Sequence, residues 1–255
     1  MSSFSLLPRV RLHRPGPDIL TALSTFLLVV HLAVEMRGGV VVLEAGGFYQ
    51  TAGLSRPGVL EGKGWQFITH ALLHGSWSHF LLNVALIYAI GGRVLNILGA
   101  RAFLRIFFLG VLGGGILHVL LFPAYPLGDN TTPAHVPLVG ASGGMMALLM
   151  SFVHLSPDSR MWPLMISGRN LGKGLMLSTL ALFLITPGLG IPGLRSSGEW
   201  LAANIMGAEL FLVSHICHFG GGLAGLLYVR RLLRSPVSLE DLRQDRKRRE
   251  EKEDL

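Results

Sequence analysis

Residues 140–153 of this 255-residue chain read GASGGMMALLMSFV, a serine among glycines at the head of an apolar run. A serine between glycines is most often a turn residue or a helix cap. Ser142 becomes a candidate nucleophile if a histidine from another segment packs against it. His218, which is followed by glycines at positions 220–222, is such a histidine. The fold and the chemistry both depend on whether these two segments meet.

The composition is that of a membrane protein. Half of the residues are hydrophobic and only 15% are charged, with a mean hydropathy of +0.52, whereas soluble domains carry about 25% charged residues. A helix needs about 20 apolar residues to cross a bilayer. Six long stretches carry no charge, at 19–34, 64–92, 106–128, 130–157, 174–194 and 210–229. The sequence therefore predicts an all-α membrane protein with six transmembrane helices.

We expect one membrane domain, residues 18–235, between a cytosolic N-terminal segment, residues 1–17, and a charged cytosolic tail, residues 236–255. In this topology 18 of the 22 Lys and Arg residues lie on the side of the two termini. The positive-inside rule then places both termini in the cytoplasm. The same topology explains the pI near 10.2, so a nucleic-acid partner is not expected. Stretch 19–34 has no small-residue cleavage site after it and is predicted to be a retained helix.

The topology sets Ser142 and His218 at a similar depth. Ser142 opens the fourth helix at its outer end. His218 lies in the sixth helix, twelve residues before cytosolic Arg230, which is roughly 18 Å of helix. Both residues therefore fall in the outer half of the membrane. Polar groups in a span usually face the bundle interior and mark function.

The second predicted helix carries His79 and Asn83, spaced i, i+4 on one face. Serine catalysis requires a base and donors for the oxyanion. We expect Ser142 to be the nucleophile, His218 the base, and His79 with Asn83 the oxyanion donors. Since Glu209 is nine residues from His218, a dyad without an orienting carboxylate is expected.

Other interpretations of the same residues compete with this one. His215 is a rival base one turn before His218, but it lacks the glycine spacing that Gly221 and Gly225 give His218. Small residues four positions apart, Gly221 and Gly225 on the sixth helix and Gly143 and Ala147 on the fourth, predict that these two helices pack closely. His70 and His74, together with His79, raise a zinc hypothesis. No glutamate follows His70 in a zincin arrangement, so no metal and no cofactor are expected.

Three motifs together resemble the rhomboid intramembrane serine proteases. They are Gly140-Ala-Ser142-Gly, His79-x-x-x-Asn83 and His218-x-x-Gly221-x-x-x-Gly225, and the match extends over about residues 64–233. The segment WQFITHALLH, residues 65–74, also resembles the family's entry to the second helix, although many bacterial members have arginine where this chain has Gln66. Segment 189–211 resembles the family's mobile cap in position only.

The resemblance implies a six-transmembrane-helix rhomboid-like bundle in a bacterial inner membrane. It implies a serine endopeptidase without cofactor, whose Ser142–His218 dyad cleaves single-span or other transmembrane substrates near the outer membrane face. The alternative is a catalytically weak rhomboid-like protein that binds and escorts transmembrane helices. A transporter is the third interpretation, and it would require charges near the bilayer centre.

Overall fold

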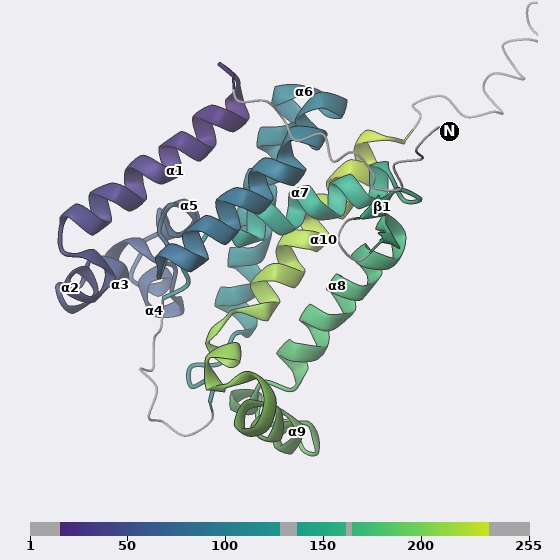
Figure 1. Cartoon of the computed structure of the whole chain (residues 1–255). Helices are drawn as coiled ribbons and strands as arrows, with labels where there is room; N and C mark the ends of the chain where they lie inside the picture. The colour runs from purple at the N-terminus through teal and green to yellow at the C-terminus, as the bar shows by residue number, and fades with distance from the viewer. Residues whose placement is uncertain (1–15, 128–136, 162–164, 235–255) are drawn as a thin grey trace, which may run out of the picture.

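The computed structural model describes residues 16–127, 137–161 and 165–234, and these residues are mostly helical. Nearly all of the predicted N-terminal segment and the whole predicted tail lie outside the described residues. The domain boundaries at residues 17 and 235 therefore stay predictions. The described residues form a helical bundle with short elements at its ends (Figure 1).

Five long helices build the bundle: α1 (Ile19–Met36), α6 (Trp77–Leu121), α7 (Ser142–Leu155), α8 (Gly168–Leu184) and α10 (His215–Leu232). Short helices and a 3-10 turn join α1 to α6: α2 (Gly39–Ala45), α3 (Phe48–Ala52), α4 (Arg56–Leu60), α5 (Gln66–Thr69) and η1 (His70–Leu72). Between α8 and α10 lie the 3-10 turn η2 (Pro187–Leu189), α9 (Leu194–Leu201), a π-helical turn η3 (Ala202–Met206) and the 3-10 turn η4 (Ala208–Leu212). Strands β1 (Arg160–Met161) and β2 (Ile166–Ser167) pair antiparallel between α7 and α8.

Helix α6 consists of two arms. Its 45 residues are interrupted at Gly99, whose φ of 79° and ψ of 170° are not helical. The chain turns back there (Figure 1), so that Gly91 of the first arm lies against the Phe103 ring of the second. The two arms occupy the places of the second and third predicted helices.

Among the described residues, two helices are long and apolar enough by themselves to span a membrane, α1 and α6. Helix α7 is apolar but has only 14 residues, about 21 Å of helix. The structure thus contains six long helical segments when the arms of α6 are counted separately. That all six cross the bilayer stays a prediction.

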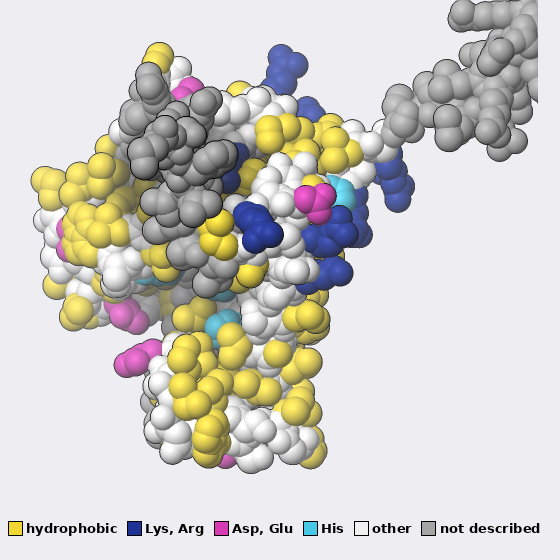
Figure 2. Space-filling model, turned by 45° about the vertical axis from the view of Figure 1, so that its right-hand side comes forward, with side chains coloured by type: hydrophobic (Ala, Val, Ile, Leu, Met, Phe, Trp, Pro, Cys, Tyr) yellow, Lys and Arg dark blue, Asp and Glu magenta, His cyan; other side chains and the backbone are white. Residues whose placement is uncertain are grey.

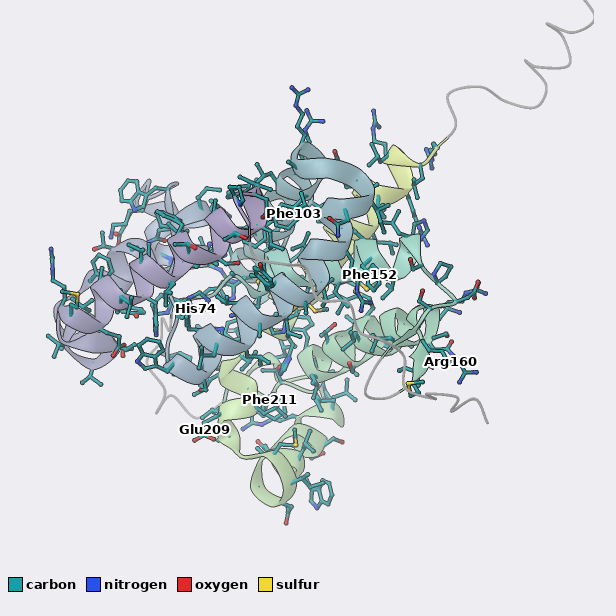
Figure 3. All side chains as sticks on the ribbon, turned by 45° about the horizontal axis from the view of Figure 1, so that its top comes forward. His74, Phe103, Phe152, Arg160, Glu209 and Phe211 are labelled. Atoms are coloured by element: carbon teal, nitrogen blue, oxygen red, sulfur yellow. The ribbon has the colours of Figure 1, made fainter. Side chains whose placement is uncertain are left out.

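Helix α7 is the central element. Eleven of its 14 residues are buried, between the second arm of α6 and α10. Glycine allows this close approach, because a methyl group at Gly110 would overlap Gly143 and Ala147 of α7. Phe103 and Phe152, labelled in Figure 3, belong to the same buried apolar core. Small residues at such contacts are typical of helix packing in membranes.

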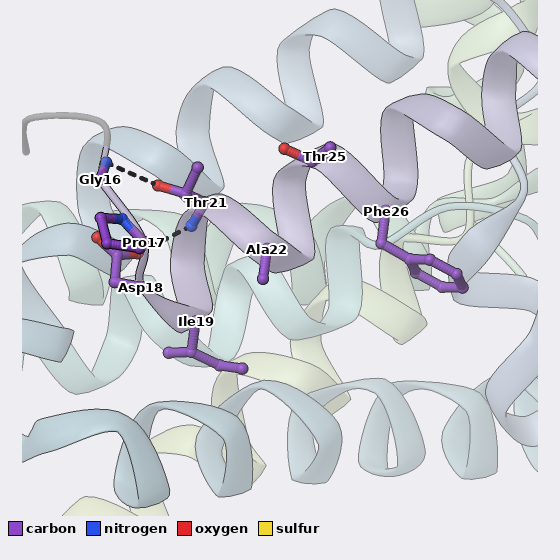
Figure 4. Close-up of a pocket in the computed structure, with 8 residues that line it drawn as sticks. All are labelled: Gly16, Pro17, Asp18, Ile19, Thr21, Ala22, Thr25 and Phe26. Carbon is purple, nitrogen blue, oxygen red and sulfur yellow. Dashed lines mark hydrogen bonds between the residues drawn. The ribbon is translucent and has the colours of Figure 1, made fainter.

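The start of α1 is capped by its own sequence. The Asp18 carboxylate accepts hydrogen bonds from the N–H groups of Leu20 and Thr21, both at 2.9 Å. Figure 4 shows Asp18 and Thr21 among the residues that line a hollow at the helix start, with the N–H of Gly16 donating to the Thr21 hydroxyl.

The surface suits a bilayer. Large apolar side chains face outward on several helices, including Leu82 at 62% exposure and Leu177 at 67%. Figure 2 shows Lys and Arg gathered toward one end of the visible face, with hydrophobic side chains spread over the rest. Apolar patches of this extent are uncommon on monomeric soluble proteins.

Candidate active site

Ser142 and His218 meet where α7 and α10 begin, each in the first turn of its helix. Ser142 Oγ lies 2.9 Å from His218 Nε2, although the residues are 76 positions apart in the chain. The cap of α7 is Ala141, and Ser142 is the first residue inside the helix. The hydroxyl therefore faces the imidazole and does not cap the helix. With the ring proton on Nδ1, Nε2 can accept the hydroxyl proton.

The packing of α10 on α7 sets this distance. A methyl group at Gly221 would overlap the carbonyl of Gly143, and one at Gly225 would overlap Ala147. These are the residues whose spacing predicted close contact between the two helices, and that packing prediction is confirmed. The two helices touch backbone to backbone one turn below the Ser142–His218 pair.

His215, the rival base, is hydrogen-bonded to a different partner. His215 Nε2 donates to the carbonyl of Leu210 at 2.9 Å, and its ring centre lies 6.2 Å from that of His218. Cys217 is buried, with its sulfur against Gly114 and Gly143. Among these three residues of α10, His218 alone is hydrogen-bonded to Ser142 in the described structure.

His79 and Asn83 converge on the turn before Ser142. Gly140 has a φ of 117°, and a Cβ there would lie 2.7 Å from His79 Nε2 and 3.6 Å from Asn83 Nδ2. Asn83 is 3% exposed, and its Nδ2 has no acceptor among the described residues. A buried donor without a partner is rare in folded proteins. These two donors lie where an oxyanion formed next to Ser142 could meet them.

Gln66 supports this turn from the segment before α6. Its buried amide donates to the carbonyls of Gln50 and Thr51, at 2.9 and 3.2 Å, and its Oε1 accepts from the N–H of Ser55. In the structure the amide joins α3, α4 and α5.

The chain of contacts continues to the site. His70 Nδ1 donates to the carbonyl of Gln66 at 2.8 Å, and the N–H of Gly140 donates to the carbonyl of His70 at 2.8 Å. The backbone next to Ser142 is therefore fixed to this loop. The sequence does not predict this bond, because residues 70 and 140 are distant in the chain.

Sequence reasoning also missed the contact between His118 and Ser214. Ser214 caps α10, with its Oγ accepting from the N–H of Cys217 at 3.3 Å. His118 Nδ1 lies 2.9 Å from the same Oγ, and both side chains are buried. The second arm of α6 is thereby hydrogen-bonded to the residue that opens the helix of His218.

In the described part of the chain, no carboxylate accompanies the pair. Glu209 is exposed and lies on the η4 segment at the edge of the bundle (Figure 3). No three His, Cys, Asp or Glu side chains converge there in a way that could hold a metal ion. The candidate site therefore consists of the hydrogen-bonded side chains of Ser142 and His218, with the side chains of His79 and Asn83 nearby.

Two histidines of the segment before α6 are held neutral by their surroundings. Burial lowers the pKa of His70 to about 4, although its bond to the Gln66 carbonyl offsets part of the effect. Burial, together with the neighbouring imidazoles of His79 and His31, lowers the pKa of His74 to about 3.

Comparison with known proteins identifies the family. The Rhomboid domain matches residues 61–235. The presenilin-associated rhomboid-like protein, mitochondrial, is 26% identical over 156 residues in Homo sapiens and in Pongo abelii, and 25% identical in Bos taurus. Each match covers 61% of this chain and 35% of the relative, so the chain spans about a third of those proteins' length.

The family match covers more than half of the chain, and the structure is mostly helical. Both findings agree with the resemblance to rhomboid proteases that the three motifs indicated. A rhomboid domain also makes the protein an integral membrane protein. This chain belongs to the rhomboid family.

Proposed function

We propose that the protein is an intramembrane serine endopeptidase that cleaves transmembrane helices near the outer membrane face. The observation that carries the proposal is the 2.9 Å contact between Ser142 Oγ and His218 Nε2. Family membership supports it, because rhomboid domains act in membranes on transmembrane substrates.

In the proposed reaction His218 Nε2 takes the hydroxyl proton as Ser142 Oγ attacks the scissile carbonyl carbon. The carbonyl oxygen becomes an oxyanion that accepts from Asn83 Nδ2, His79 and a backbone N–H that opens α7. His218 then gives its proton to the leaving amine, and the amide C–N bond breaks. Water, activated by His218, cleaves the acyl-enzyme ester and restores Ser142. The reaction needs no metal or cofactor.

The proposal includes a topology. The two arms of α6 and helices α1, α7, α8 and α10 would be the six spans, with both termini on the basic, cytoplasmic side. The bacterial inner membrane stays a prediction, since the relatives are named as mitochondrial proteins. Single cysteines introduced after α1 and after α8, in a Cys217→Ser background, should react with an impermeant reagent from outside the cell.

Cleavage should be measured with the purified protein and a single-span substrate in proteoliposomes, with the cut position determined by mass spectrometry. Ser142→Ala and His218→Ala should each abolish cleavage, while Ser151→Ala should keep it. Ser151 is a matched control, because it is buried on the same helix and bonds the Gly225 carbonyl at 3.2 Å. Cleavage by the Ser142→Ala protein would overturn the proposal. Binding of the substrate by the wild type without cleavage would favour the escort alternative.

A further inference from the structure

A second candidate binding site lies at the opposite end of α7 from Ser142. A cavity of about 630 Å³ opens between the last turns of α7, the first half of α8 and the end of α10. Its first lining residue on α7 is Met150, eight positions after Ser142, or roughly 12 Å along the helix. The cavity is therefore separate from the proposed catalytic pair.

The rim of the cavity is cationic. Arg169 and Lys173 lie one turn apart on α8, and Arg230 comes from the last turn of α10. All three are exposed. Arg169 contacts Asp158 at 3.4 Å, with both side chains open to solvent. Within the described ranges, no acidic side chain pairs with Lys173 or Arg230, so this rim attracts an anion.

The walls are apolar. Met150 and Val153 of α7, Met176 of α8 and Leu226 of α10 line the cavity. Gly172 keeps this wall open, since a Cβ there would lie 2.7 Å from Val153 Cγ2. Figure 2 shows Lys and Arg next to hydrophobic side chains at one end of the visible face. A cationic rim above apolar walls matches a ligand with an anionic head and a hydrocarbon chain.

The expected position of the cavity in the bilayer also favours a lipid ligand. The cavity lies at the basic end of the helices, where lipid headgroups would be found, and basic pockets between membrane helices recognise anionic headgroups. We propose that this cavity binds an anionic glycerophospholipid. Arg169, Lys173 and Arg230 contact its phosphate, and an acyl chain lies along Met150 and Leu226. The inference does not depend on the proposed protease activity.

The test is lipid affinity of the full-length protein in a neutral detergent, measured by native mass spectrometry with phosphatidylglycerol. Each cation near a membrane surface contributes a factor of about five in affinity. The Lys173→Ala/Arg230→Ala protein should therefore bind about 25-fold more weakly. Arg101→Ala/Arg105→Ala is the matched control, because these exposed arginines lie outside the cavity and its affinity should change less than twofold.

Two further arms distinguish the source of the anion. Phosphatidylcholine should bind at least tenfold more weakly than phosphatidylglycerol, and inorganic phosphate at the same concentration should not displace the lipid. Equal binding of the two lipids, displacement by inorganic phosphate, or an equal loss in the control protein would each overturn the proposal. If the double variant does not fold, the single change Lys173→Gln at an exposed position should still give the fivefold loss, and an unchanged affinity would refute the site.

Discussion

The turn before Ser142 offers a sharp test of how the oxyanion donors are held, through Gly140→Ala. A Cβ at this position would lie 2.7 Å from His79 Nε2 and 2.8 Å from His79 Cε1, whereas ordinary van der Waals contact begins at 3.4 Å. The His79 ring or the turn must therefore move by about 0.7 Å. The φ of 117° adds backbone strain, about 1–2 kcal/mol for a residue with a side chain.

The backbone strain and the displacement of His79 should be seen in different measurements. Strain lowers the free energy of unfolding, while displacement of an oxyanion donor lowers the rate. A misplacement of about 1 Å can cost about 10²-fold in rate, so we expect a 10- to 100-fold loss of kcat. KM should change little, because the oxyanion forms only during the reaction.

Gly62→Ala is the matched control. Gly62 has a φ of 87° and no atom within 4 Å of an added Cβ, so the control introduces the strain without the overlap. Cleavage kinetics in proteoliposomes and thermal unfolding should be measured for both proteins. If Gly140→Ala kept a kcat within twofold of Gly62→Ala, the assignment of His79 to the site would be refuted.

Three further predictions follow from buried contacts. His118→Ala removes the hydrogen bond to Ser214 and should lower kcat about tenfold with KM unchanged. A lower free energy of unfolding without any change in kcat would show that the contact is only structural. Gln66→Ala leaves two carbonyls and one N–H without their partner and should lower the free energy of unfolding by about 2–4 kcal/mol, so a melting temperature like the wild type would contradict its role. His70 and His74 have folded pKa values of about 4 and 3 against 6.5 unfolded, so the unfolded chain binds more protons below pH 6.5. The free energy of unfolding should therefore be independent of these two histidines above pH 6.5. It should fall as pH drops toward 4, by about 1.4 kcal/mol per pH unit for each histidine, and His70→Asn should weaken this pH dependence.

Charge and hydropathy predicted the helices well where each helix is a self-contained apolar segment. Stretch 19–34 became α1, and 210–229 became most of α10. Stretch 64–92 begins before its long helix, because the tertiary hydrogen bonds of Gln66 hold its first residues in the short elements α5 and η1 ahead of α6. Stretch 130–157 also began too early, since α7 starts only after the positive φ of Gly140. Such boundaries depend on local backbone geometry that an uncharged run does not reveal.

The site was predictable to the extent that it follows helical spacing. The motifs placed Ser142, His218, His79 and Asn83 on facing helices, and the glycine spacing predicted the contact of α7 with α10. The supporting contacts were not predictable, because each joins residues far apart in the chain. The bond between His118 and Ser214 spans 96 positions.

The central claim is that Ser142 is a nucleophile activated by His218. Labelling of the purified protein with a fluorophosphonate probe in detergent, followed by peptide mapping, tests it most directly. The account predicts one adduct, on Ser142, in the wild-type and Ser151→Ala proteins, and none in the Ser142→Ala and His218→Ala proteins. An adduct on another residue, or undiminished labelling of Ser142 in the His218→Ala protein, would contradict the account.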